Sequence, residues 1–458
     1  MNKAAHDGPT KRVRRESDAL GYPHFMTVWR GQTVSVFGSQ MAAFAISIWI
    51  YQETGSVIQF GAVIAAQLLP SIIFAPITGV LVDRYHRKNV MLASELGLIA
   101  ASLLFYVLIS VGKLTPITIV LFSPFIALFG SVHQIAYASS IPLLVPRVAY
   151  GKANGYVQLG INGSAAIVPL ISVYALESLG LKAVILLNVT TYLIAAISLT
   201  FAKFMDLPSS SAQTSEGFSL KRLLAQQSFG FRYMLSHRTL LVLVMFLCAV
   251  SFLNGIVLVL FRPMILSEES ATVLGWLVTI AGIGGLAGAI VAAMTSSRGE
   301  KIRTLLLASI VSGINMACCG MSTNLVLIAA LVFVFSFSAP FILVTAQTLM
   351  QTITPTEIQG RVFASRSGFA GVALIIAVIV SPLLAENLFA PWTRDGHVLA
   401  SVAEFLGAGK SAGMRVVFVL AGLVMVVLAV AASQSSHFRA LRRQIQEGVL
   451  APANPAYV

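Results

Sequence analysis

Charged residues are scarce in this sequence. Asp, Glu, Lys and Arg together make up 10% of its 458 residues, whereas 57% are hydrophobic. A soluble domain usually carries about 25% charged residues, because its surface must be hydrated. The composition therefore excludes an ordinary soluble protein and indicates a membrane protein with many spans.

Cysteine and the common catalytic motifs are also scarce. The three cysteines, Cys248, Cys318 and Cys319, all fall within apolar runs, and we interpret them as small packing residues. The sequence contains no GxxxxGK[ST] phosphate loop, no HExxH and no paired CxxC. The glycine-rich run Gly282–Gly288 lies within an apolar stretch, so we expect close helix packing there rather than dinucleotide binding. We therefore expect no enzyme, no metal ion, no cofactor and no direct use of ATP.

Apolar stretches of about 17–25 residues recur along the chain, each bounded by charged or turn residues. We predict an all-α polytopic membrane protein with twelve transmembrane helices. The predicted spans cover residues 27–51, 57–82, 90–111, 116–138, 153–174, 182–203, 240–266, 271–294, 303–320, 324–350, 362–388 and 411–432. Most connections are short, so neighbouring helices must be antiparallel.

The distribution of cations predicts the orientation of these spans. Most of the 30 Lys and Arg residues fall in the two chain ends and in the even-numbered connections. The odd-numbered connections hold only Lys113, Lys182, Arg394 and Lys410. By the positive-inside rule we expect both termini to lie in the cytoplasm. The net charge of +13 is then a topological signal, and we expect no nucleic-acid partner.

The longest internal connection divides six spans from six. We predict a cytoplasmic N-terminal tail (1–26), a first six-helix half (27–203), a central loop (204–239), a second six-helix half (240–432) and a cytoplasmic C-terminal tail (433–458). Hydrophobic residues at helical spacing between 220 and 231 predict an amphipathic helix in the central loop. The C-terminal tail is expected to continue as a charged helix that contacts anionic lipid.

Some residues recur between the two halves at a constant offset of 209 residues. The matching pairs are Gly79 with Gly288, Pro146 with Pro355, Gly151 with Gly360, and Lys152 with Arg361. Two halves in parallel repetition are typical of transporters in which a central site faces each side of the membrane in turn.

The most specific pattern follows the second predicted span, where residues 79–88 read GVLVDRYHRK. A glycine allows two helices to approach closely, a carboxylate at a helix end can bind a neighbouring helix N-terminus, and cations can bind headgroups. The pattern resembles the G-x-L-x-D-R-x-G-R-[RK] signature of the major facilitator superfamily. The resemblance implies the major facilitator fold, with two six-helix pseudo-repeats, and a cytoplasmic gating motif. The motif residues are Gly79, Asp83, Arg84, His86, Arg87 and Lys88, with His86 at a position where the family usually has glycine.

Further stretches narrow the resemblance within that superfamily. WRGQTVS at 29–35, GSQM at 38–41, PLLVP at 142–146 and GFRY at 230–233 are similar to the branch that contains macrolide efflux proteins and the enterobactin exporter. This branch implies export of amphiphilic natural products or drugs by proton antiport. Drug:proton antiporters of the superfamily often carry an arginine in the fourth span, and residues 130–137 contain none.

Ionisable residues within the spans are few, and the cost of placing them in a bilayer makes them functional candidates. Glu95 lies in the third predicted span and His133 in the fourth, while Arg30, Arg262 and Glu386 lie near span ends. We predict that Glu95 or His133 couples proton movement to transport. The alternative is a polar contact that fixes the packing of two helices.

In the superfamily arrangement, the first, fourth, seventh and tenth spans line the central cavity. Mixed aromatic and amide side chains there suit a bulky amphiphile, which needs few fixed hydrogen bonds. The candidate lining residues are Gln40, Phe44, Tyr137, Asn254, Phe337 and Gln347. Ordinary helix packing is the alternative for each of them.

Together with what the resemblance implies, these observations predict a secondary active efflux transporter in a bacterial inner membrane. We expect it to export a hydrophobic or amphiphilic compound, such as a drug, a macrolide or a siderophore, by alternating access. Protons and membrane lipid are the other expected partners, and a monomer suffices for this architecture. An uptake carrier for a small metabolite is the alternative. A polytopic membrane enzyme or receptor has little support. The sequence shows neither the convergent polar cluster that an enzyme would need nor the soluble output domain that a receptor would need.

Overall fold

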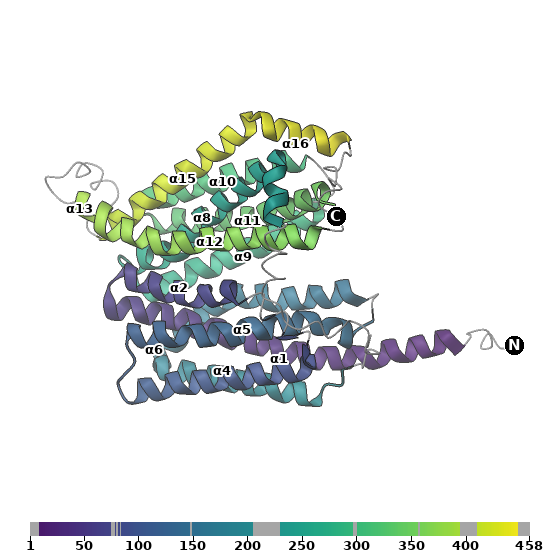
Figure 1. Cartoon of the computed structure of the whole chain (residues 1–458). Helices are drawn as coiled ribbons and strands as arrows, with labels where there is room; N and C mark the ends of the chain where they lie inside the picture. The colour runs from purple at the N-terminus through teal and green to yellow at the C-terminus, as the bar shows by residue number, and fades with distance from the viewer. Residues whose placement is uncertain are drawn as a thin grey trace. The chain divides into compact units, whose positions relative to one another are not determined.

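The computed structural model is dominated by long α-helices (Figure 1). It describes residues 9–74, 78, 81–82, 84–146, 149–204, 230–295, 300–355, 358–393 and 410–447. Within these ranges, ten helices are long and apolar enough to cross a bilayer, and α2 is a shorter apolar helix. The predicted all-α polytopic fold is confirmed.

The helices follow the predicted spans closely. Those of the first half are α1 (Pro9–Thr54), α2 (Val57–Ile73), α4 (Arg87–Ser110), α5 (Pro116–Leu144) and α6 (Tyr150–Phe201). Those of the second half are α8 (Arg238–Leu266), α9 (Ala271–Thr295), α10 (Lys301–Met321), α11 (Leu325–Ile353), α12 (Gln359–Leu383), the π-helical η2 (Leu384–Phe389), α13 (Ala390–Trp392), α15 (Lys410–Gln434) and α16 (Ser436–Glu447).

The long helix α6 contains the fifth and the sixth predicted spans. Gly180 interrupts it with φ 78° and ψ 164°, a conformation that residues with a Cβ atom rarely adopt. The break falls between the predicted spans 153–174 and 182–203, so one glycine provides the turn between two antiparallel helices. With α6 divided in this way and α2 included, the described segments account for twelve spans.

Local sequence explains where several helices begin. Thr115 and Thr118 form a capping box at the start of α5, in which each hydroxyl accepts a hydrogen bond from the other residue's backbone N–H. At the start of α11, Asn324 Oδ1 accepts hydrogen bonds from the amides of Val326 and Leu327 at 2.9 and 3.2 Å. These side chains satisfy amides that would otherwise lack partners at the helix ends.

The structure differs from the predicted boundaries at several places. Helix α1 begins at Pro9, inside the predicted tail, because hydropathy marks the membrane segment of a helix and not its polar extension. The predicted amphipathic helix in the central loop lies largely outside the described residues, of which 230–236 are helical. In the predicted C-terminal tail, Ser436–Glu447 form the helix α16, as expected.

The chain divides into two compact units. The first contains residues 1–46 and 73–218, and the second contains residues 47–72 and 219–458. The division follows the two predicted halves except for residues 47–72, which comprise the end of α1 and most of α2 and belong to the second unit. Arg262 of α8, for example, donates a hydrogen bond to Ser47 Oγ at 3.1 Å, and a Cβ atom on Gly61 would lie 2.8 Å from Pro382.

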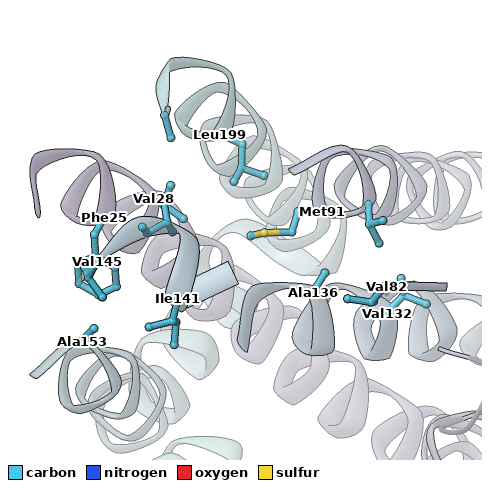
Figure 2. Packing of buried hydrophobic residues seen from close by; sticks show 13 residues of the cluster. Phe25, Val28, Val82, Met91, Val132, Ala136, Ile141, Val145, Ala153 and Leu199 are labelled. Atoms are coloured by element: carbon cyan, nitrogen blue, oxygen red, sulfur yellow. The ribbon is translucent and has the colours of Figure 1, made fainter. Parts of the chain in front are cut away.

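A hydrophobic cluster forms part of the core of the first unit (Figure 2). It brings together Phe25 and Val28 of α1, Met91 of α4, Val132 and Ala136 of α5, and Leu199 of α6, among others. In the second unit, α9 packs closely against α11 at two glycines. A Cβ atom on Gly284 or Gly288 would overlap the carbonyl oxygen of Phe333 or Phe337. The expected packing role of the run Gly282–Gly288 is confirmed at these positions.

Candidate functional site

Glu95 lies in the middle of the buried face of α4. The buried residues of this helix include Met91, Glu95, Leu98 and Ser102, which recur every three or four positions and so share one face. The side chain of Glu95 is fully buried, with 0% of its surface exposed. It lies eight residues after Arg87, or about 12 Å along the helix axis at 1.5 Å per residue. The carboxyl group therefore lies well inside the membrane span.

His133 of α5 faces this carboxyl group. Its Nε2 atom lies 3.1 Å from Glu95 Oε1, close enough for an ion pair although the two atoms are not aligned as a hydrogen bond. The imidazole is 13% exposed, in contrast to the fully enclosed carboxyl group. The structure thus brings together the two ionisable residues that the sequence singled out separately.

The surroundings of the Glu95–His133 contact are apolar. Met91, one turn before Glu95, belongs to the cluster of Figure 2 with Val132 and Ala136, which lie beside His133 on α5. Leu98, one turn after Glu95, belongs to a second buried cluster. An apolar environment strengthens the electrostatic interaction between two opposite charges and raises the cost of leaving either one unbalanced.

The close approach of α4 and α5 at this level depends on Gly97. A Cβ atom at this position would lie 2.6 Å from the ring of Phe129, which is one turn before His133 on α5. The absence of a side chain at Gly97 therefore allows the two helices to bring Glu95 and His133 within reach of each other.

Four buried polar atoms at the contact have no hydrogen-bond partner among the described residues. They are both carboxyl oxygens of Glu95, His133 Nε2 and the hydroxyl of Tyr137, which follows His133 by one turn. A buried carboxylate without full hydrogen bonding is costly, and either an imidazolium or a proton on the carboxyl group removes that cost. The geometry can therefore hold a proton between α4 and α5.

The gating motif is described only in part. Gly79 and Asp83 lie outside the described residues. Arg84 and His86 are exposed, and the His86 ring lies edge-on to Phe204 with ring centroids 6.3 Å apart. The structure thus leaves the predicted roles of these residues as predictions.

Lys88 contacts the end of another helix. Its Nζ atom donates hydrogen bonds to the carbonyl oxygens of Thr200 at 3.1 Å and Ala202 at 2.9 Å, where α6 ends. A cation at this position compensates the partial negative charge of the helix C-terminus and satisfies carbonyls that have no partner within the helix. The motif lysine therefore joins the start of α4 to the end of α6.

The candidate cavity residues occupy varied environments. In the first unit, Phe44 is buried, whereas Gln40 and Tyr137 are half-buried, and Gln40 Nε2 donates to the carbonyl oxygen of Ile161 at 3.4 Å. In the second unit, Asn254, Phe337 and Gln347 are half-buried. Phe337 lies between Phe333 and Phe341 in a row of three rings along α11, with centroids 6.3 and 5.5 Å apart.

The second unit encloses a cavity of about 180 Å³ between α8, α9, α10, α11 and α15. Its lining is mainly apolar and aromatic, with polar groups from Arg262, Asn315 and Ser336. None of Asn254, Phe337 and Gln347 lines it. Sequence reasoning noted Arg262 near a span end but missed Asn315, for which the signal was an amide side chain within the apolar ninth span. Pockets that hold drug-sized ligands measure about 300–1,000 Å³, so this cavity can hold only a fragment of such a molecule.

Arg415 is a further residue that the sequence did not single out. It is 1% exposed and donates hydrogen bonds to Glu268 in the α8–α9 connection, from Nη2 to Oε2 at 2.5 Å and from Nε to Oε1 at 3.1 Å. It also donates to the carbonyl oxygens of Ser322 and Gly320 at the end of α10. Burial raises the pKa of Glu268, but the hydrogen bonds from Arg415 and Ser411 and the charge of Arg415 outweigh this effect, so the pKa lies below its usual range.

Glu386, in the π-helical η2, interacts with the start of α2. Its carboxylate accepts hydrogen bonds from the amide of Val57 and from Ser56 Oγ, the latter at 3.4 Å. A carboxylate is favourable at a helix N-terminus because it meets unpaired amides and the positive end of the helix dipole. This residue, which the sequence placed near a span end, thus caps α2 within the second unit.

Comparisons with known proteins identify the family. A sequence model of the Major Facilitator Superfamily matches residues 28–265 and again residues 247–435. Macrolide efflux protein A of Streptococcus pyogenes is 25% identical over 379 residues, which cover 80% of this chain and 90% of that protein. The multi-drug resistance efflux pump PmrA of Streptococcus pneumoniae serotype 4 is 24% identical over 327 residues, which cover 70% of this chain and 77% of that pump.

Solved structures show the same fold at low sequence identity. A bacterial homolog of the human lysosomal transporter Spinster, in an inward-facing and unoccupied conformation, has a TM-score of 0.67 at 14% identity and covers 95% of this chain and 99% of its own. A D-xylose-proton symporter has a TM-score of 0.62 at 15% identity and covers 88% of this chain and 97% of its own. The relatives and the apolar helices indicate a transporter rather than an enzyme, in a multi-pass bacterial membrane protein.

Proposed function

Since the chain belongs to the Major Facilitator Superfamily, in the branch of macrolide efflux proteins, we propose that it exports an amphiphilic compound from the cytoplasm in exchange for protons. The two matches of the family model correspond to two repeats, which suit alternating access to a central site. Efflux is the activity named for the macrolide and multidrug relatives.

The contact between Glu95 and His133 is the observation that carries the proposal of proton exchange. A proton-driven carrier needs a group inside the membrane whose charge changes when a proton binds. The enclosed Glu95 carboxyl group and the partly exposed His133 imidazole, 3.1 Å apart, meet this need. Protonation of the carboxyl group releases the imidazole from its charge partner, and loss of the proton restores the attraction.

The proposed substrate class follows from the apolar and aromatic character of the described interior. The cavity in the second unit offers few polar groups, and three phenylalanine rings follow one another on α11. Apolar contact of this kind favours bulky amphiphiles, among them the macrolides for which a relative is named. The cavity of about 180 Å³ is smaller than such a compound, so the full binding site must extend beyond it.

The direction of transport requires the proposed orientation, with both termini in the cytoplasm. It rests on the concentration of Lys and Arg in the chain ends and the even-numbered connections. In this orientation the gating motif lies on the cytoplasmic side, and Glu95 and His133 lie in the inner leaflet.

Efflux measured with and without a proton gradient tests the proposal. Cells that express the full chain are loaded with a panel of macrolides, peptides and siderophores, and retention is followed with and without a protonophore. We expect efflux of at least one amphiphile, and we expect the protonophore to abolish it. Efflux that persists without the gradient would exclude proton exchange, and net accumulation would favour an uptake carrier.

Variants of the pair separate proton coupling from helix packing. We expect Glu95→Gln combined with His133→Ala to lose proton-dependent efflux while the protein remains folded and in the membrane. Gln134→Ala is the matched control, because Gln134 is adjacent to His133 but exposed. Retained proton-dependent efflux in the double variant would refute the coupling role of both residues.

A further inference from the structure

The C-terminal helix α16 is docked against the second unit by its apolar face. Phe438 and Leu441, three positions apart, are buried, whereas Arg439, Arg442 and Arg443 are exposed. The Phe438 ring lies edge-on to Phe246 of α8, with ring centroids 5.7 Å apart. Figure 1 shows α16 following directly on α15. The docking therefore fixes the positions from which the arginines project.

A cavity of about 410 Å³ lies between α16 and the beginning of α10. Its charged lining consists of Arg303, Arg439, Arg442 and Glu300, and Arg442 forms an ion pair with Glu300. Three positive charges against one negative leave these four residues with a net charge of +2. A site of this size and charge is complementary to a phosphate-bearing group.

Apart from Ser433, the remaining lining of this cavity is apolar. It includes Ile302, Leu306 and Ile310, which share one face of α10. Leu307, which also lines the cavity, and Val311 and Ile314 beyond it are 50%, 38% and 47% exposed. They follow the exposed Arg303 at helical spacing, so an exposed stripe runs from a cation at the helix end to apolar residues deeper in the span.

We propose that this cavity binds the anionic headgroup of a membrane phospholipid, with an acyl chain along the stripe of Leu307, Val311 and Ile314. The change from cationic to apolar surface along α10 matches the change from headgroup to acyl chain along a lipid. A free anion would use the arginines but would leave the apolar part without a function. In the proposed orientation the site belongs to the cytoplasmic leaflet, and it is independent of the transported substrate.

Native mass spectrometry of the purified full-length protein tests the proposal. The probes are dioleoyl phosphatidylglycerol, which is anionic, and dioleoyl phosphatidylcholine, which is zwitterionic with no net charge. We expect the wild-type protein to retain phosphatidylglycerol preferentially. The variant Arg303→Gln/Arg439→Gln should bind it about 30-fold more weakly, since each cation near an anionic lipid surface contributes about 1 kcal/mol.

Control variants separate this site from general charge effects and from misfolding. Arg232→Gln/Arg238→Gln removes two exposed cations outside the cavity and should leave the preference within about twofold of wild type. Arg303→Lys/Arg439→Lys keeps the charge and should restore most of the binding.

Three results would overturn the proposal. They are unchanged binding in Arg303→Gln/Arg439→Gln, an equal loss in the control Arg232→Gln/Arg238→Gln, and equally tight binding of glycerol 1-phosphate, which has no acyl chain. A loss of binding that the lysine variant does not restore would also contradict the charge argument.

Discussion

Replacing Glu268 by alanine is expected to destabilise the second unit more than replacing its partner Arg415 by methionine. Arg415 is 1% exposed, whereas the Glu268 side chain is 30% exposed. Without Glu268, a buried guanidinium keeps its charge and, among the described residues, retains only the carbonyls of Gly320 and Ser322 as hydrogen-bond partners. Without Arg415, the half-exposed carboxylate can bind water. The two truncations of the same ion pair therefore have different costs.

The expected magnitudes follow from this difference in burial. Leaving a buried charge unpaired costs about 3–5 kcal/mol, which we expect for Glu268→Ala. We expect about 1–3 kcal/mol for Arg415→Met, because water replaces part of the lost interaction at Glu268. The double variant removes both charges and should be more stable than Glu268→Ala alone by about 2 kcal/mol, since an apolar replacement of a buried pair is often nearly neutral.

Thermal unfolding of the purified protein, followed by tryptophan fluorescence, measures this order. At about 2–4 °C per kcal/mol for a unit of this size, the double variant should unfold about 4–8 °C above Glu268→Ala. If the double variant unfolds at a lower temperature than Glu268→Ala, the effects of the two substitutions accumulate. The guanidinium is then not a buried charge that depends on Glu268, and the reasoning fails.

Three further predictions concern the titration of Glu268, the contact between α9 and α11, and the end of α6. The lowered pKa of Glu268 stabilises the folded state, and this stabilisation is fully present above the carboxyl group's pKa in the unfolded chain, about 4.3. It is lost as the pH falls through the pKa of Glu268 in the folded protein. The unfolding temperature of the wild-type protein should therefore drop more steeply below pH 4 than that of Glu268→Gln. Gly288→Ala should lower the free energy of unfolding by about 1–3 kcal/mol, because the new methyl group overlaps the Phe337 carbonyl. The control Gly285→Ala, whose new Cβ atom has its nearest contact 3.9 Å away, should be neutral. Equal unfolding temperatures of the two variants would contradict the packing. Lys88→Ala should lower the unfolding temperature by the equivalent of about 0.5–2 kcal/mol through the loss of the α6 cap, and Lys88→Arg should recover most of it; no difference between Lys88→Ala and wild type would show that the cap adds no stability.

The number and type of the elements could be predicted from sequence because each span is a local property. About 20 apolar residues in succession identify a membrane helix whatever its neighbours are. The break within α6 was visible for the same reason, since the apolar runs on either side of Gly180 are each long enough to form a span. The packing of residues 47–72 with the second unit depends on contacts far apart in the chain, and no local pattern contained it.

The candidate site could be predicted as residues but not as an arrangement. Glu95 and His133 were identifiable because ionisable side chains are rare and costly within spans. Their 3.1 Å separation depends on the face that α4 turns toward α5 and on the space left by Gly97, both of which are tertiary features. Their role in proton coupling stays a prediction. Arg415 was overlooked because it lies near a span end, where an arginine is common, and because its partner Glu268 is 147 residues away.

The separation of Glu268 and Arg415 along the chain has a consequence for synthesis. At about 5–20 residues per second, the ribosome adds Arg415 roughly 7–30 s after Glu268. By the later part of this interval α8, α9 and α10 have been synthesised, but Glu268 and the carbonyls of Gly320 and Ser322 still lack their shared donor. The last transmembrane helix thus completes a polar junction that three earlier segments leave open. A chain released before α15 lacks Arg415, so Glu268 and the carbonyls of Gly320 and Ser322 stay without the hydrogen bonds that Arg415 donates in the finished protein.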